Sequence, residues 1–171
     1  MKNKLLLMLT LLGLLLALGA CRQSADTSAP PDIRYGEDVC DRCQMIINEE
    51  RYAAAYWTAG GQARRFDDIG GMLAYHQETG EEVASFWVHD YASGEWIPAG
   101  ESYLVFDPGL HSPMGFGVAA CASEAQARSL AYGQAGAFVL PFDQALAQLA
   151  AGDLALDPSQ RHEMEGMSGN E

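Results

Sequence analysis

The pattern of apolar and polar positions predicts a first round of strand, strand, helix and strand between residues 45 and 91. Two stretches rich in apolar and aromatic side chains flank a glycine turn, as in a hairpin, and the apolar residues that follow recur at the i, i+3, i+4 and i+7 spacing of a helix. Asp67 or Asp68 is expected to cap this helix, and Gly80 to end it. The expected elements are strands at residues 45–57 and 62–66, a helix within residues 66–80, and a strand at residues 82–91.

A second round of the same order follows along the chain. Ser123, with Gln126 three residues later, matches a capping box at the start of a helix, and Gly133 is expected to end that helix. The expected elements are strands at residues 95–107 and 112–123, a helix within residues 123–133, a strand at residues 137–142, and a last helix at residues 143–152.

The repeated order predicts an α+β protein made of two sequential ββαβ units packed together. We expect the first unit at residues 37–92 and the second at residues 93–152. Met45 and Met114 each stand at the expected entry of a strand, which is a local echo between the two units.

The N-terminus predicts export and a lipid anchor. Lys2 and Lys4 precede an apolar run, which is too short and wrongly flanked for a stable membrane span and is typical of a secretory signal. Its end, LALGAC, resembles the lipobox of bacterial lipoproteins, which implies a signal peptide at residues 1–20 and an acylated Cys21. The alternative is an ordinary signal peptide that ends at a cysteine. Arg22 replaces the Asp that retains lipoproteins in the inner membrane, which slightly favours the outer membrane, facing the periplasm.

The segments that flank the two units are polar. Residues 21–36 contain prolines and polar side chains and are expected to form a flexible tether, and residues 153–171 lack an apolar period and are expected to be disordered. Removal of residues 1–20 removes both lysines and no acid, so the formal charge changes from −13 to −15. So acidic a surface repels phosphate backbones, which excludes nucleic acid as a partner.

The cysteines limit the chemistry. Three remain after Cys21, and an odd number leaves at least one thiol outside a disulfide, which favours metal over a disulfide framework. Cys40 and Cys43 form a C-x-x-C motif, which suits thiol exchange, structural zinc or copper. A thiol-exchange motif normally opens a helix, whereas Met-Ile-Ile after Cys43 predicts a strand. Structural zinc needs four ligands, and the chain has only one such pair.

Copper(I) suits this motif best, because thiolate and thioether ligands select this soft ion and it accepts two or three donors. If the segment is a strand, residues i and i+2 point to the same side. Cys43 and Met45 would then present both sulfur atoms to one ion, with Gln44 facing away and Cys40 in the preceding loop. The alternative for Met45 is a core residue.

At this point the chain resembles the NosL family, copper-binding lipoproteins that accompany the assembly of nitrous oxide reductase. The resemblance covers the lipobox and roughly residues 37–149, and it is carried by several motifs in order: CDRCQM, FDDIGGMLAY, VHDY followed by Trp96, and SPMGFGVAA. It implies paired ββαβ units similar to a domain of organomercurial lyase, and no catalytic activity. It also implies a copper(I) chaperone for the catalytic copper centre of nitrous oxide reductase, acting with the ABC-type maturation complex of that enzyme.

The resemblance also implies a set of site residues. Cys43 and Met45 are the expected copper ligands, and Met114 of the second unit is the expected third. His89 is a candidate neighbour or exchangeable ligand. Cys40 is either an auxiliary thiol or pairs with Cys43 when the site is empty. Outside this set, Cys121 is expected to be a core cysteine, and His162, Met164 and Met167 of the tail are expected to capture copper weakly.

An alternative from another class stays open from the residues. Cys40 and Cys43 of an exported protein would also serve a thiol-disulfide oxidoreductase. Replacement of Met45 separates the two hypotheses, because it would weaken copper binding and leave such an enzyme largely active.

Overall fold

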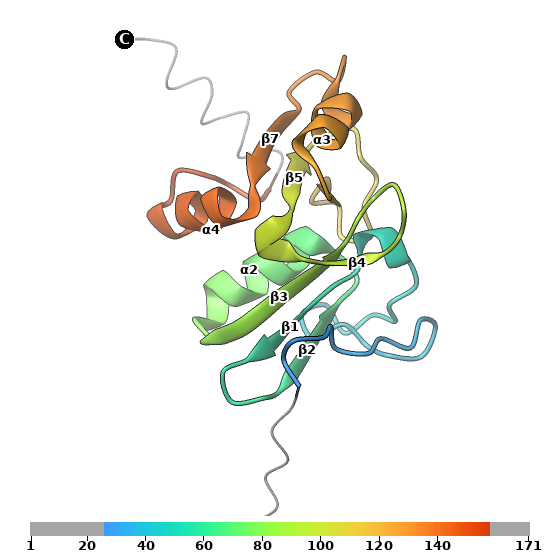
Figure 1. The fold of residues 1–171 in the computed structure, drawn as a ribbon, viewed down its shortest axis with the longest axis vertical. Helices are drawn as coiled ribbons and strands as arrows, with labels where there is room; N and C mark the ends of the chain where they lie inside the picture. Colours follow the sequence, from blue (N-terminus) through green and yellow to red (C-terminus); the bar gives the residue numbers. More distant parts are fainter. Residues whose placement is uncertain (1–25, 158–171) are drawn as a thin grey trace, which may run out of the picture.

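The computed structural model describes residues 26–157 (Figure 1). The expected signal peptide, Cys21, and the tail residues His162, Met164 and Met167 lie outside the described residues. Within residues 26–157, none of the helices has the length and apolar character needed to cross a membrane.

Two antiparallel sheets form the framework of the fold. The first has the strand order β2-β1-β3-β4 and the second the order β6-β5-β7. The strands are β1 (Ala54–Thr58), β2 (Ala63–Phe66), β3 (Val83–His89), β4 (Trp96–Pro98), β5 (Tyr103–Phe106), β6 (Val118–Cys121) and β7 (Phe138–Pro141). The helices are α2 (Ile69–Thr79), α3 (Glu124–Ala131) and α4 (Phe142–Ala151), with short 3-10 turns at Glu50–Tyr52 and Ala99–Glu101.

The strand–strand–helix–strand order occurs twice, as β1-β2-α2-β3 and as β5-β6-α3-β7. In each unit the first strand lies between the other two, because β1 pairs with β2 and β3, and β5 pairs with β6 and β7. The α+β prediction is therefore confirmed. β4 lies in the range that was assigned to the second unit, yet it pairs with β3 in the first sheet.

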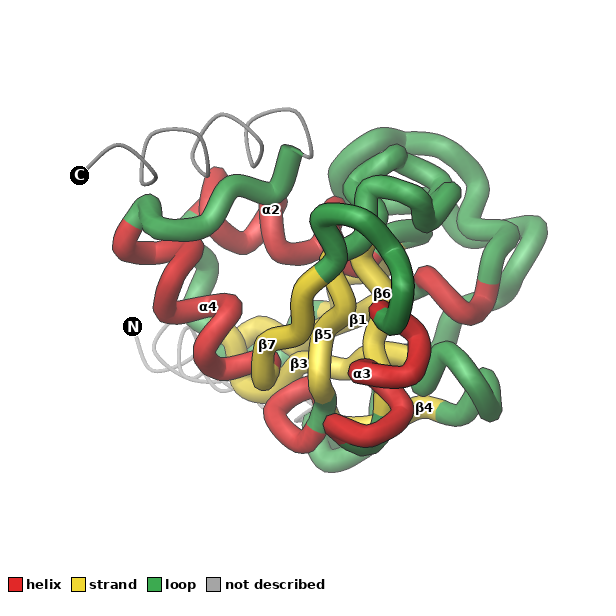
Figure 2. The backbone as a smooth tube through the Cα atoms, turned by 90° about the horizontal axis from the view of Figure 1, so that it is seen from above, coloured by secondary structure: helices red, strands yellow, loops and turns green. Residues whose placement is uncertain are grey.

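The two units meet around β6 and α2. A parallel bridge joins Asp90, just after β3, to Ala120 of β6, and the Tyr91 amide donates to the Ala120 carbonyl at 2.8 Å. Helix α2 contacts β1 and β2 of the first sheet and also β6 of the second. Figure 2 shows α2 and α4 on the same side of the molecule. The start of α2 is thus enclosed between units.

The ends of α2 follow the signals in its sequence. Asp68 has extended backbone angles, and its side chain accepts from the amides of Gly70 and Gly71, which would otherwise lack partners at the helix start. Gly80 ends the helix in the left-handed conformation, with φ of 63°, which glycine adopts without steric cost. The predicted helix at residues 66–80 is confirmed.

Three predicted strands differ from expectation. The stretch at residues 95–107 is divided into β4 and β5 by the 3-10 turn at Ala99–Glu101, and two others are shorter than expected. The stretch at residues 45–57 is a strand only over Ala54–Thr58, and the stretch at residues 112–123 only over Val118–Cys121. Gln44 has φ of 63°, which breaks an extended chain just before Met45, and Gly115 and Gly117 have φ of 76° and 62°. The expectation that Met45 and Met114 open strands is wrong, because both lie in irregular segments outside them.

Candidate metal centre

The C-x-x-C motif lies in a tight loop that folds back on itself. Val39 and Ile46 form an antiparallel bridge, and the Cys40 amide donates to the Met45 carbonyl at 2.8 Å. The positive φ of Gln44 turns the chain inside this loop, and its side-chain amide donates to the Cys40 carbonyl at 3.1 Å. Reversal of the chain over so few residues places the two thiols on one turn.

Asp41, between the two cysteines, fastens this loop to the edge strand β2. Its amide donates to the Arg65 carbonyl at 2.8 Å, and its carboxylate accepts from the Arg65 amide at 2.7 Å. The Arg64 guanidinium also lies 3.5 Å from the Asp41 carboxylate. Several bonds to this strand hold the loop against the edge of the sheet, and they fix the position of the cysteines on either side of Asp41.

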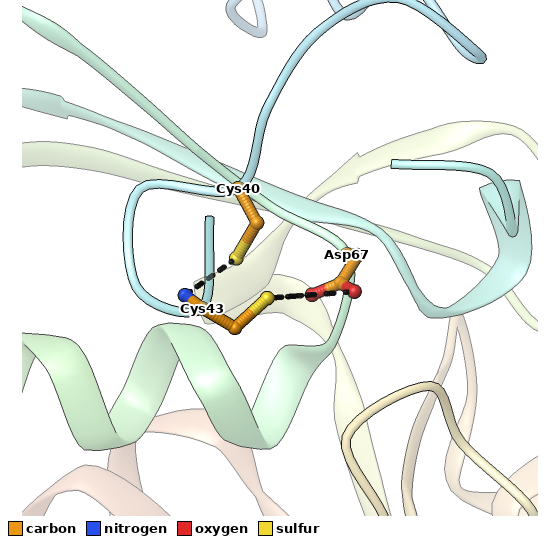
Figure 3. A group of neighbouring side chains, drawn as sticks. All are labelled: Cys40, Cys43 and Asp67. Atoms are coloured by element: carbon orange, nitrogen blue, oxygen red, sulfur yellow. Dashed lines mark hydrogen bonds between the residues drawn. The ribbon is translucent and has the colours of Figure 1, made fainter. Parts of the chain in front are cut away.

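Cys40, Cys43 and Asp67 form a compact cluster (Figure 3). One ligand atom from each residue lies within 4.8 Å of the others, and both cysteines are free thiols. The Cys43 amide donates to the Cys40 sulfur at 3.5 Å, and the Cys43 thiol lies 3.6 and 3.8 Å from the two Asp67 oxygens. Cys40 is fully buried and Cys43 is half-buried, so the cluster opens to solvent on the side of Cys43.

Burial sets the protonation of the deeper thiol. Burial raises the pKa of Cys40 to about 12, although the backbone amides of Cys43, Asp67 and Arg42 oppose this by stabilising the thiolate. Cys40 is therefore a neutral thiol at physiological pH in this arrangement. A bound cation would have to displace its proton in order to use the sulfur as a ligand.

Met114 of the second unit lies against the first turn of α2. Its amide donates to the Asp68 carboxylate at 2.9 Å, and its sulfur lies 2.7 Å from the point where a side chain on Gly71 would begin. The guanidinium of Arg42, which belongs to the cysteine loop, stands 5.5 Å from the centre of the Phe116 ring, two residues after Met114. The cysteine loop and the Met114 loop therefore meet at the same end of α2.

Known proteins that resemble this chain agree with one another. The NosL family model matches residues 34–149. A protein of Stutzerimonas stutzeri named copper-binding lipoprotein NosL is 31% identical over 159 residues, which cover 83% of each chain. This chain belongs to the NosL family. The predicted family is thus confirmed, and this relative's name describes a copper-binding lipoprotein rather than an enzyme.

A solved structure supports the fold. The crystal structure of the copper chaperone NosL from Shewanella denitrificans aligns with a TM-score of 0.58 and 15% identity, over 68% of this chain and 94% of that one. At this identity the match shows the NosL fold alone.

The structure does not bring every expected ligand of this NosL chain to the cluster. Met45 is 51% exposed, beyond the turn at Gln44, so the expectation that it shares a strand face with Cys43 is wrong. Its role as a ligand stays a prediction, because an exposed thioether on a loop is free to reorient.

His89 is buried in a different setting from Met45. It is 1% exposed, with its Nε2 atom 2.7 Å from the Tyr35 hydroxyl and its Nδ1 atom 2.6 Å from the Gly94 carbonyl. Its ring also packs on Trp96, with 3.8 Å between ring centres. Burial lowers the pKa of His89, so the ring is neutral and both nitrogens are occupied. To bind a metal, His89 would have to give up its bond to Tyr35.

Asp67 was missed as a member of the cluster. The sequence pattern assigned Asp67 and Asp68 to helix capping, and the structure gives that task to Asp68 alone. Neighbouring residues of an extended segment point in opposite directions, so a pair of acids before a helix leaves one carboxylate free to face elsewhere. Here that carboxylate faces Cys43. The prediction that Cys121 is a core cysteine is confirmed, because Cys121 is 2% exposed in β6.

Proposed function

We propose that this chain is a lipid-anchored copper(I) chaperone that faces the periplasm and delivers copper for maturation of nitrous oxide reductase. The observation that carries the proposal is the cluster of Cys40 and Cys43, whose sulfur atoms lie within 4.8 Å of each other at a half-open site. The names of its relatives, a copper-binding lipoprotein and a copper chaperone, support the same metal.

The donor types favour the cuprous ion. Sulfur ligands select copper(I), whereas the carboxylate of Asp67 is a hard donor that suits other ions. Cys43 is the central ligand of this proposal, because the residue is half-buried and its sulfur lies between Cys40 and Asp67. Met45, two residues after Cys43, and Met114 of the second unit are the further soft donors of this proposal, and His89 is a candidate exchangeable ligand.

The arrangement suits transfer of copper as cargo. Few ligands leave one side of the ion open, so a donor on a partner can bind the ion before the first ligands leave. Acylation at Cys21 would hold the chaperone at a membrane surface that faces the periplasm and raise its effective concentration near membrane-bound machinery. We propose the ABC-type maturation complex as that machinery and nitrous oxide reductase as the final recipient.

The oxidoreductase alternative finds less support in the site. Thiol exchange needs a reactive thiolate, and burial raises the pKa of Cys40 to about 12. The C-x-x-C loop also lacks a helix of its own, because Asp41–Cys43 form a turn and the chain continues as a loop.

Titration of the reduced, delipidated protein with copper(I) against a chromophoric chelator tests metal binding. We expect the wild type to take a single equivalent from the chelator and Cys43→Ser to lose this ability. Cys121→Ala is the matched control, because it removes a buried thiol that lies outside the cluster. Failure of the wild type to compete would contradict the proposal.

Delivery needs a separate measurement. In cells that make nitrous oxide reductase, we expect Cys43→Ser to lower the copper content of the purified enzyme, and Cys21→Ser to lower it through loss of the anchor. Normal copper content of the enzyme in the Cys43→Ser strain would contradict the proposed delivery, and it would not bear on the proposal that the chain binds copper.

A further inference from the structure

The two oxygens of the Asp68 carboxylate serve two different segments of the chain. Oδ1 accepts from the amides of Gly70 and Gly71 at 2.8 and 3.4 Å, which caps α2. Oδ2 accepts from the Ser112 hydroxyl at 2.6 Å and from the Met114 amide at 2.9 Å. Helix capping needs only the first pair of bonds, so the second pair has another consequence: it ties the Met114 loop to the start of α2.

The tie extends into the Met114 loop itself. The Ser112 hydroxyl, which donates to Asp68, also accepts from the Gly117 amide at 3.1 Å, and the Gly115 amide donates to the Ser112 carbonyl at 2.9 Å. Asp68 is fully buried and Ser112 is 8% exposed, so water does not compete well for these bonds. The loop is therefore closed around one buried carboxylate.

Gly70 and Gly71 let this loop approach the helix more closely than any other residue would. A side chain on Gly70 would begin 2.3 Å from the Phe116 Cβ atom, and one on Gly71 would begin 2.7 Å from the Met114 sulfur. Glycine is unfavourable inside a helix by about 1 kcal/mol relative to alanine, so two in the first turn require a reason. Contact with the loop supplies it, and at Gly71 the atom accommodated is the thioether sulfur.

We propose that Asp68 and Gly71 are positioning residues, which place the Met114 sulfur at the start of α2 beside the Cys43 loop. This inference rests on the proposed function, since it assigns to Met114 the role of copper ligand. Asp67 faces the cysteines of the first unit, Asp68 holds the backbone of Met114, and Gly71 admits its sulfur. One short segment before and inside α2 thus joins the soft donors of both units.

Gly71→Ala tests the positioning of the sulfur. The added methyl group meets only the far part of a flexible side chain, and alanine favours the helix, so we expect the metal-free variant to fold with an unfolding temperature close to that of the wild type. We expect its copper(I) affinity to fall about 10-fold or more, as when other supporting contacts of a metal ligand are lost. Copper-edge absorption should show one sulfur ligand fewer.

Asp68→Asn tests the tie without removing the cap. Asparagine caps helices as well as aspartate does, but its amide nitrogen cannot accept from the Met114 amide in place of Oδ2. We expect a loss of copper(I) affinity similar to that of Gly71→Ala. The far-ultraviolet circular dichroism spectrum should show that α2 is retained. Gly60→Ala is the matched control for Gly71→Ala, because an alanine at residue 60 has space and lies away from the site.

A double-mutant cycle separates positioning from general disturbance. If Gly71 acts through the Met114 sulfur, Gly71→Ala weakens copper(I) binding in the wild type and changes nothing further in a Met114→Leu background. An equal loss in both backgrounds, or wild-type affinity in Gly71→Ala while Met114→Leu binds weakly, would overturn the inference.

The cycle also distinguishes this inference from the proposed function. If Met114→Leu binds copper(I) like the wild type while Cys43→Ser does not bind it, the positioning role fails and the chaperone stands. If Cys43→Ser binds like the wild type, the proposed cysteine centre itself is contradicted.

Discussion

Helices α2 and α3 occupy equivalent places in the two units, yet their first turns differ in burial and in the partners of the capping residue. The first turn of α2 is buried, and its cap, Asp68, is fully enclosed. The first three residues of α3, Glu124–Gln126, are exposed. Among the described residues, the hydroxyl of its cap, Ser123, bonds only to Gln126, as acceptor from the amide at 3.3 Å and as donor to the side chain at 2.9 Å.

The difference arises from what lies on top of each helix start. Loops from both units cover α2, namely the cysteine loop through Asp67 and the Met114 loop through Asp68. At α3 the two positions after the first helical residue are Ala125 and Gln126, both exposed, where α2 has Gly70 and Gly71. The same topology thus yields an ordinary surface helix where nothing covers it, and a candidate metal centre where two loops converge.

Removal of the two caps should give the largest difference in unfolding free energy between the two helices. Asp68→Ala leaves the buried donors of Ser112 and Met114 without an acceptor in addition to the loss of the cap, so we expect a loss of roughly 3 kcal/mol of unfolding free energy. Ser123→Ala should cost only about 1 kcal/mol. Urea unfolding of both variants measures the difference, and equal losses would show that Asp68 is no more than a cap.

Exchange of glycine and alanine at the second helical position should lower the stability of the two helices for different physical reasons. Gly70→Ala forces the new methyl group against Phe116, so we expect a loss of about 1 to 3 kcal/mol despite the better helix propensity of alanine. Ala125→Gly should cost up to about 1 kcal/mol from propensity alone. Thermal unfolding distinguishes the cases, and a more stable Gly70→Ala would refute the close approach of the Met114 loop.

Ion pairs of the two units should give the smallest difference in stability, and this difference should depend on pH. Glu81 accepts from the Arg64 Nε atom at 3.1 Å and from the Tyr56 hydroxyl at 2.6 Å, and its bond to Arg64 holds the pKa of Glu81 below its usual 4.5. A lowered folded pKa stabilises the fold above the unfolded value, and this stability is lost as pH falls through the folded pKa.

Glu81→Gln should therefore cost about 1 kcal/mol at pH 7 and less at pH 3, because the wild type loses the same contribution as pH falls from 4.5 through the folded pKa. Glu124→Gln on α3 removes an exposed pair with Arg128 and should cost at most about 0.5 kcal/mol. Unfolding free energies at both pH values test this, and a constant cost for Glu81→Gln from pH 7 to pH 3 would contradict the shifted pKa.

The sequence was a reliable guide where periodicity and caps act locally. The helix from Ile69 to Thr79 follows from its apolar spacing, from Asp68 and from Gly80, all within its own length. The same holds for α3, where Ser123 caps as expected. It misled where strand-like composition met a turn, because Met-Ile-Ile after Cys43 has the side chains of a strand but follows a residue with φ of 63°.

By itself the sequence determined the family, the α+β class and the repeated element order, because motifs, periodicity and caps are properties of neighbouring residues. Only the tertiary structure decided which donors meet. It brought Asp67 to Cys43, set Met114 against Gly71, left Met45 exposed and enclosed His89 between Tyr35 and Gly94. Such contacts depend on how two units pack and how loops turn, and the free energy of that packing is shared among residues far apart in the chain.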